Sequence, residues 1–204
     1  IELALRIAET LGVQLEIDRS ATDFDTVCEQ VALGKADVGI SKLSVTLKRA
    51  QYVRFTEPYA LLRICLLVDR LHEAKINLKG GDVISHCRQA RVRIGVYKRS
   101  ALEYYLRQWF PKAEAVPYDN FTDQVQALLN GEIYFVMDDE LEVVHYLKAH
   151  PELTLRLDTI VLPNLQDPIA IAVSPDSPNL LALLNLLIRY SDIPLRMKDM
   201  QSLR

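Results

Sequence analysis

Hydroxyl and cationic side chains follow a short apolar segment near residue 40. Residues 36–40 are of strand type, and Ser44 and Thr46 come soon after them. Arg49 follows Ser44 closely, and a guanidinium fork with hydroxyl and backbone N–H donors at a strand end suits the two oxygens of a carboxylate. The pattern therefore predicts a site for a small carboxylate at Ser44 and Arg49. It also fits a strand followed by a helix that Thr46 caps, with Arg49 in solvent.

The elements that would position these groups alternate between helix and strand, as hydrophobic periodicity and turn residues indicate. In the first part of the chain we expect helices at 1–11 and 24–33, strands at 13–18 and 36–40, a short helix from 47, a loop at 55–59 and a long strand at 60–69. After an irregular stretch at 72–90 we expect strands at 92–97, 115–118 and 134–137, helices at 101–109, 121–129 and 141–149, a β-rich run at 155–162, a crossing at 163–168, a strand at 169–173 and a last helix from 178.

This alternation is typical of a largely parallel sheet. The long strand at 60–69 and the crossing at 163–168 imply two passages between lobes. We therefore expect an α/β fold with two mainly parallel-sheet lobes, 1–62 plus 168–204 and 63–167. A cleft with a hinge is the usual place for a small ligand in such a fold.

Composition narrows the possible partners. The chain has 204 residues, of which 50% are hydrophobic, enough to bury a sizeable core. A formal net charge of -3, with both signs mixed along the chain, disfavours nucleic acid and anionic membranes as partners. No apolar run reaches the roughly 18–20 residues that a spanning helix needs.

Cysteines and histidines offer no metal site. Cys28, Cys65 and Cys87 are odd in number and widely spaced, so we expect buried apolar residues rather than disulfides or zinc ligands. The four histidines include no pair at the i,i+4 spacing of a helical metal site; His145 and His150, for example, are five apart. We expect neither a metal nor a cofactor.

The order of motifs along the chain resembles the family 3 solute-binding proteins of amino-acid ABC transporters. The resemblance extends over about residues 1–188, is specific for the fold and the ligand-binding class, and is much less specific for the ligand. The motifs that carry it are Phe24-Asp-Thr-Val27, Gly34-Lys-Ala-Asp37, Ser44-Val-Thr-x-x-Arg49, Phe55-Thr-Glu-Pro-Tyr59, Arg93 to Glu103, Tyr118 to Thr122 and Asn130 to Glu140.

Further site residues follow from this resemblance. It implies that Asp139 accepts the ligand's α-ammonium, although an N-cap role for the following helix is the alternative. Ser100 and the helix amides beside it would hold the other side of the carboxylate. Phe24 would pack on the aliphatic part of the ligand.

Two positions depart from the family pattern. Lys42 and Arg99 stand where the family has small residues, and Arg99 belongs to a turn in which one hydroxyl is lost. Either side chain can point to solvent. If both face the site, an acidic ligand side chain becomes the preferred one.

The resemblance implies extracytoplasmic binding of a small amino acid between the lobes, which close to present it to a permease or a membrane-anchored sensor. The periplasmic location comes from the resemblance alone. The chain opens in a helical pattern with no N-cap residue before it, which suggests a piece of a longer protein, such as a sensing domain of a larger membrane protein.

Two other readings stay open. A periplasmic cyclohexadienyl dehydratase would use Asp139 or Glu140 as an acid, although the sequence has no evident Ser/His/Asp or Cys/His set. A domain whose pocket has decayed would bind no amino acid. The particular amino acid and the oligomeric state do not follow from the sequence.

Overall fold

The computed structural model describes residues 1–76 and 83–190, and it shows α/β architecture as predicted. The chain divides into two compact units. Unit 1 comprises Ile1–Leu61 and the chain from Asp167 onward, and unit 2 comprises Leu62–Gln166. The predicted boundaries between the lobes, after residues 62 and 167, each lie one residue later than the boundaries of these units.

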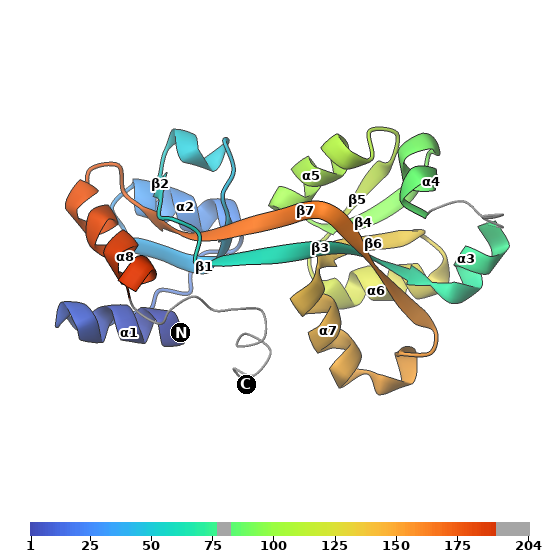
Figure 1. Ribbon diagram of the computed structural model, residues 1–204, viewed down its shortest axis with the longest axis horizontal. Helices are drawn as coiled ribbons and strands as arrows, with labels where there is room; N and C mark the ends of the chain where they lie inside the picture. The colour runs from blue at the N-terminus through green and yellow to red at the C-terminus, as the bar shows by residue number, and fades with distance from the viewer. Residues whose placement is uncertain (77–82, 191–204) are drawn as a thin grey trace. The chain divides into compact units, whose positions relative to one another are not determined.

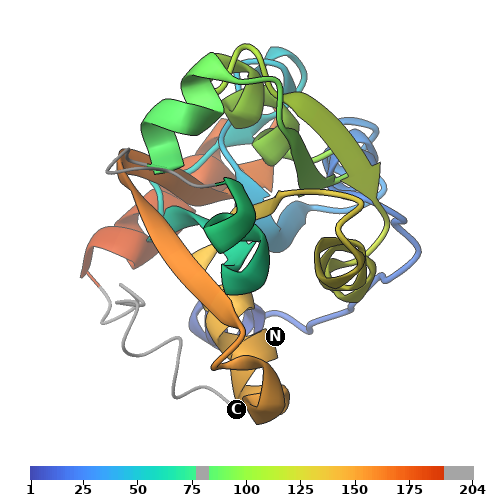
Figure 2. The ribbon, with the colours of Figure 1, turned by 90° about the vertical axis from the view of Figure 1, so that its right-hand side faces the viewer.

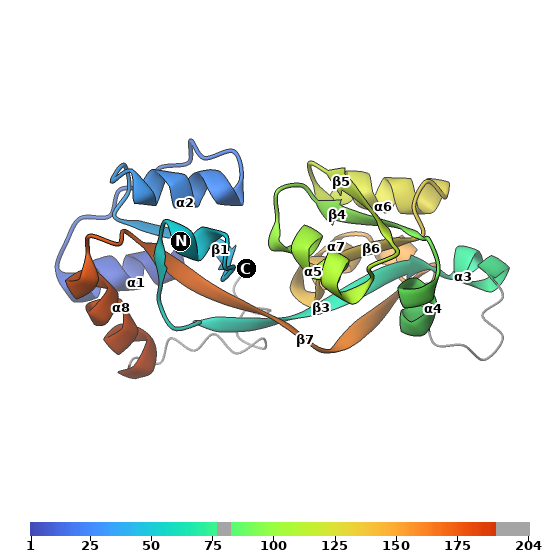
Figure 3. The same cartoon turned by 90° about the horizontal axis from the view of Figure 1, so that it is seen from above.

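Unit 1 packs helices on both sides of a small set of strands. Helix α2 (Phe24–Ala32) lies on one side of β1 (Val38–Ser44) and β7 (Leu157–Val173), and α8 (Pro178–Tyr190) lies on the other (Figure 3). Asp23 caps α2 by accepting a hydrogen bond from Thr26 N at 2.9 Å. The other elements of this unit are α1 (Glu2–Leu11), η1 (Arg49–Gln51), β2 (Arg54–Phe55) and the first residues of β3 (Ala60–Asp69).

The strand pairs described within unit 1 are antiparallel, so the expectation of a mainly parallel sheet is wrong there. Both β1 and β2 pair with the C-terminal part of β7. The direction follows from β7, which returns to unit 1 from unit 2 along a single long strand. Neither hydrophobic periodicity nor element order specifies that direction.

The strand predicted at 13–18 is also wrong, because residues 12–22 have no regular structure. Val13 and Ile17 have the alternation of a strand but are 59% and 48% exposed. Alternation sets which face a side chain occupies, but a strand also needs a neighbour for its backbone hydrogen bonds. No strand in the described part of the chain pairs with this segment.

Unit 2 is a sheet covered on both faces. Its strand order is β7-β3-β6-β4-β5, with β4 (Arg93–Tyr97) parallel to β5 (Glu114–Tyr118) and to β6 (Phe135–Asp139), and with β3 antiparallel to β6. Helices α4 (Val83–Gln89) and α5 (Ala101–Trp109) pack on one face, and α6 (Phe121–Asn130) and α7 (Glu140–Ala149) on the other (Figure 1, Figure 2). The remaining elements are α3 (Arg70–Ile76) and η2 (Pro151–Leu153).

Two expectations for unit 2 need correction. The stretch predicted as irregular at 72–90 contains most of α3 and all of α4, which forms because Val83 and Cys87 bury against the sheet. Gly80 and Gly81 lie outside the described residues. The crossing predicted at 163–168 is part of the continuous strand β7, which accommodates a positive φ of 64° at Asn164.

Replacement of Gln124 by leucine is expected to stabilise the protein. Gln124 lies on the sheet-facing side of α6, is 0% exposed, and both polar atoms of its amide are buried without a hydrogen-bond partner. Because each unmade hydrogen bond costs free energy, we expect Gln124→Leu to raise the free energy of unfolding by about 1–3 kcal/mol in urea titrations.

The matched control is Gln126→Leu on the exposed side of the same helix, where the amide donates to Asn130 Oδ1. It should change the free energy of unfolding by no more than about 0.5 kcal/mol. A destabilised Gln124→Leu protein would show instead that the amide has a partner in solution.

Candidate functional site

Arg49 is the centre of a buried polar cluster in unit 1. It is 2% exposed, its Nε donates to Asp25 Oδ1 at 2.9 Å, and its Nη1 donates to the Ser44 carbonyl oxygen at 3.1 Å. The Phe24 ring lies beside the group, with its centroid 5.8 Å from Arg49 Cζ. The alternative of a solvated Arg49 is wrong, because the guanidinium is fixed from two sides. Its Nη2 has no acceptor within residues 1–76 and 83–190.

Thr46 and Lys48 complete this cluster. The Thr46 hydroxyl accepts from Arg49 N at 3.3 Å, but the short helix predicted from 47 is the 3-10 helix η1, whose N-cap residue is Lys48 and not Thr46. Lys48 Nζ lies 2.6 Å from Asp25 Oδ2, so both carboxylate oxygens of Asp25 have cationic partners. Burial by itself raises the pKa of Asp25, but the hydrogen bonds from Lys48 and Arg49, together with their charges, bring that pKa below its ordinary value.

Acid is expected to weaken this cluster. A carboxyl with a lowered folded-state pKa contributes stability above its unfolded pKa of about 4 and loses that contribution as pH falls through the folded value. Relative to Asp25→Asn, the wild type should be more stable by about 2 kcal/mol at pH 7, and this difference should shrink at acidic pH. Urea unfolding across pH tests this, with exposed Asp37→Asn as the control; a pH-independent difference would contradict it.

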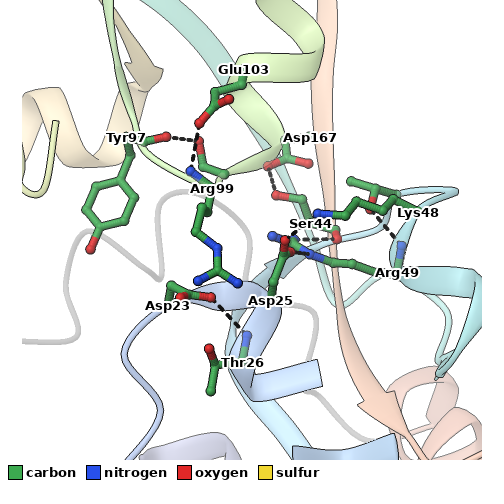
Figure 4. Close-up of polar contacts among 12 residues, drawn as sticks. Asp23, Asp25, Thr26, Ser44, Lys48, Arg49, Tyr97, Arg99, Glu103 and Asp167 are labelled. Atoms are coloured by element: carbon green, nitrogen blue, oxygen red, sulfur yellow. Dashed lines mark hydrogen bonds and ion pairs between the residues drawn. The ribbon is translucent and has the colours of Figure 1, made fainter. Parts of the chain in front are cut away.

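The Ser44 hydroxyl is already engaged within unit 1. It donates to Asp167 Oδ2 at 2.7 Å, and both residues are buried. Figure 4 shows Ser44 between Asp167 and Arg49, with its side chain toward the first and its backbone carbonyl toward the second. Asp25 and Asp167 were not among the residues that the sequence indicated as site residues. The sequence carries only a weak signal for either residue. Asp25 is an acidic residue directly after Phe24, and Asp167 is an acidic residue just before the apolar end of β7.

Lys42 occupies a distorted position in β1. Its φ is 50°, and the register between β1 and β7 shifts between Gly39 and Leu43, which marks a bulge. A non-glycine residue in this region is strained, and such bulges often re-aim groups beside functional sites. The Lys42 backbone is hydrogen-bonded to the Tyr59 hydroxyl, and burial raises the pKa of Tyr59 to about 12.

In unit 2, Asp139 is the N-cap of α7 and is 4% exposed. Its Oδ1 accepts from Glu142 N at 3.0 Å, while Asp138 Oδ1 accepts from Asp139 N at 2.8 Å. Glu140 pairs with Arg63 through two hydrogen bonds of 2.7 Å. The capping alternative therefore holds for Asp139, and a ligand-binding role for its carboxylate stays a prediction.

Ser100 and Arg99 form the turn before α5. Ser100 is the N-cap, but its hydroxyl donates to the Tyr97 carbonyl oxygen at 2.6 Å instead of capping the helix. Arg99 is exposed with φ 55°, and its backbone N–H donates to Glu103 Oε1 at 2.7 Å. The role of Arg99 in binding stays a prediction.

We also searched the described part of the chain for metal sites, membrane-spanning helices, cysteines and pockets. No group of three or more His, Cys, Asp or Glu side chains is arranged for a metal ion in those residues, and no helix there has the length and apolarity to cross a membrane. The three cysteines are free and buried, as predicted. A surface pocket of unit 2 is lined by Arg88, Gln108, Trp109 and Pro111, and none of the predicted site residues lines it.

The α/β fold of this chain matches the folds of solute-binding proteins of known structure. The family model of bacterial extracellular solute-binding proteins, family 3, matches residues 1–190, and the chain belongs to this family. The resemblance drawn from the motifs is thereby confirmed. Membership of an extracellular family also implies an extracytoplasmic location.

Individual relatives agree with this assignment. ABC transporter arginine-binding protein 1 of Escherichia coli (strain K12) is 27% identical over 183 residues, which cover 88% of this chain and 71% of that protein. An amino acid ABC transporter substrate-binding protein from Streptococcus pneumoniae Canada MDR_19A, solved with L-arginine, is 25% identical with a TM-score of 0.74, over 98% of this chain and 78% of that chain. An ancestral arginine-binding protein bound to arginine is also 25% identical with a TM-score of 0.74, over 98% and 82% of the two chains.

These comparisons bear on two expectations. The relatives named above are two amino-acid-binding proteins of ABC transporters and an ancestral arginine-binding protein, none of them an enzyme, which confirms the preference for a binding protein over a dehydratase. The preference for an acidic ligand side chain is not supported, because these relatives bind arginine. That preference assumed that Lys42 and Arg99 face the ligand.

Proposed function

We propose that this protein is the substrate-binding component of an amino-acid ABC transporter and that Arg49 receives the α-carboxylate of its ligand. The observation that carries the proposal is the burial and hydrogen bonding of the Arg49 guanidinium. Its guanidinium is buried and held by Asp25 and the Ser44 carbonyl, while Nη2 has no acceptor in the described chain. A guanidinium fixed in this way loses little entropy when it binds a carboxylate.

The ligand class that we propose is the basic amino acids. Arginine is bound by the E. coli, S. pneumoniae and ancestral relatives described above. Asp25 pairs with Arg49 and with Lys48, and its negative charge offsets part of the positive charge that would oppose a cationic ligand in unit 1. The buried carboxylate of Asp139 would supply negative charge for the ligand's α-ammonium from unit 2.

Binding by both units would give the protein its signal. A ligand held by Arg49 in unit 1 and by Asp139 and the Ser100 turn in unit 2 would bind a closed form more tightly than an open one. Ligand would then shift the population toward closure, which a permease or a membrane-anchored sensor reads.

A thermal-shift and calorimetric screen tests this function. L-Arginine and L-lysine are expected to raise the melting temperature, in proportion to the logarithm of ligand concentration above Kd, and L-glutamate should not. Prephenate and arogenate should be neither bound nor turned over. The absence of binding by any amino acid, or turnover of prephenate, would overturn the proposal.

A further inference from the structure

The surface pocket of unit 2 lies where the C-terminal parts of α4 and α5 meet. It has a volume of about 340 Å³ and is lined by Arg88 of α4, Gln108 and Trp109 of α5, and Pro111. Arg88 Cζ lies over the Trp109 ring, 5.1 Å from its centroid, and the partly buried indole packs against the core of unit 2. Both helices cover the same face of the sheet (Figure 1), so the pocket belongs to unit 2 alone.

The Arg88 guanidinium is positioned without an acceptor atom. Cation–π attraction to the face of an indole holds a guanidinium and leaves N–H groups available to donate. Among the described residues, Arg88 makes no ion pair and donates no hydrogen bond. A guanidinium in this state suits a carboxylate, which accepts two parallel N–H bonds from its fork.

The chain around the pocket is basic, although the whole protein is not. Two segments, 83–91 and 104–112, contribute the pocket residues and contain no Asp or Glu. Their arginine and lysine residues are Arg88, Arg91, Arg107 and Lys112. Lys112 has no ion-pair partner among the described residues, and the contacts of Arg91 and Arg107 with carboxylates are long, at 3.9 and 4.0 Å. The net charge of -3 opposes a broad anionic surface, whereas this local group of cations fits a short acidic segment.

Gln108 and Pro111 suit a polypeptide better than a lone anion. Gln108 Nε2 donates to Tyr104 Oη at 2.6 Å, and Gln108 Oε1 accepts no hydrogen bond from the described residues. That oxygen can accept from a backbone N–H, while the Pro111 ring gives apolar contact for the aliphatic stem of a side chain. An inorganic anion would use neither group.

We propose that this pocket docks an extended acidic segment of a partner protein, with one Asp or Glu side chain bound by Arg88 beside Trp109. None of the residues proposed to bind the amino acid lines the pocket, so the inference does not depend on that function. Trp109 is the single tryptophan of the chain, and its fluorescence therefore reports on this pocket.

A defined acidic peptide tests the proposal. The full chain would be titrated at low ionic strength with C-terminally amidated hexaglutamate; fluorescence anisotropy of a labelled peptide gives the affinity, and Trp109 emission with the unlabelled peptide gives the location. We expect saturable binding that changes Trp109 emission, whereas hexalysine should leave that emission unchanged. Arg88→Gln should weaken hexaglutamate binding about 10-fold or more.

The matched control is Lys148→Gln, which removes the same charge from an exposed position on α7, on the other face of the sheet. It should change the peptide affinity by less than about twofold. Circular dichroism confirms that both variants are folded.

Several outcomes would overturn the inference. They are the absence of saturable hexaglutamate binding, binding that leaves Trp109 emission unchanged, and wild-type affinity in folded Arg88→Gln. Inorganic phosphate or phosphatidylglycerol vesicles that bind through Arg88 at least as tightly as the peptide would also overturn it, because the occupant would then be a small anion or a membrane. Amino-acid binding is measured separately, so failure of the proposed function and failure of this inference are distinguishable.

Discussion

Arg49→Gln is expected to lower the affinity for L-arginine by about 100-fold or more, because the α-carboxylate loses its charge-assisted donors, each worth about 1.5–3 kcal/mol. The substitution should leave a folded protein, since Lys48 still pairs with the Asp25 carboxylate at 2.6 Å. Isothermal calorimetry measures the affinity, and circular dichroism with thermal melting confirms the fold.

The matched control is Arg54→Gln. Arg54 is an exposed cation on β2, and among the described residues its guanidinium makes only a long contact of 3.5 Å, to the Ala50 carbonyl oxygen. Its loss removes the same net charge from unit 1 but should change the arginine affinity by less than about twofold. If folded Arg49→Gln retains wild-type affinity, the carboxylate is bound elsewhere and the proposed function loses its main support.

Arg156→Ala is expected to cost about 3 kcal/mol of unfolding free energy in unit 2. Asp69, which is 0% exposed, accepts from Arg156 Nε at 2.9 Å and lies 2.7 Å from Arg156 Nη2. Arg156 Nη2 also donates to the Leu129 carbonyl oxygen at 3.0 Å, so the side chain ties the end of β3 to the end of α6. Removal of the guanidinium leaves a buried carboxylate without its main cationic partner, which is among the costlier single changes in proteins.

Urea unfolding with two comparisons tests that expectation. Arg91→Ala removes a cation whose side chain is 84% exposed and 3.9 Å from Glu114, so it should cost no more than about 0.5 kcal/mol. The double variant Asp69→Asn with Arg156→Ala should cost less than the sum of the single variants, because the two side chains are in contact. Additive losses, or a loss below about 1 kcal/mol in Arg156→Ala, would mean that the pair contributes little.

The local elements were largely predictable, because their signals lie within a few residues. Helix α6 is specified by Asn120, which caps it through Asp123 N at 2.8 Å, and by Gly131, whose φ of 76° ends it. The candidate Arg49 was predictable for the same reason, since its spacing from the apolar strand is a local property. The segment at 13–18 shows where local signals fail. Its side chains alternate as in a strand, but local sequence does not show whether a neighbouring strand is present for its backbone hydrogen bonds.

The sequence by itself determined the α/β class, most helices and strands, the family, and Ser44 and Arg49 as the candidate donors of unit 1. Only the tertiary structure decided what those donors do. Asp25 fixes Arg49 from the preceding helix, and Asp167 accepts a hydrogen bond from the Ser44 hydroxyl although it lies 123 residues away in the chain. The reason is physical: capping and periodicity act over one or two turns, whereas the polarity of a hydroxyl depends on which carboxylate the register of distant strands places beside it.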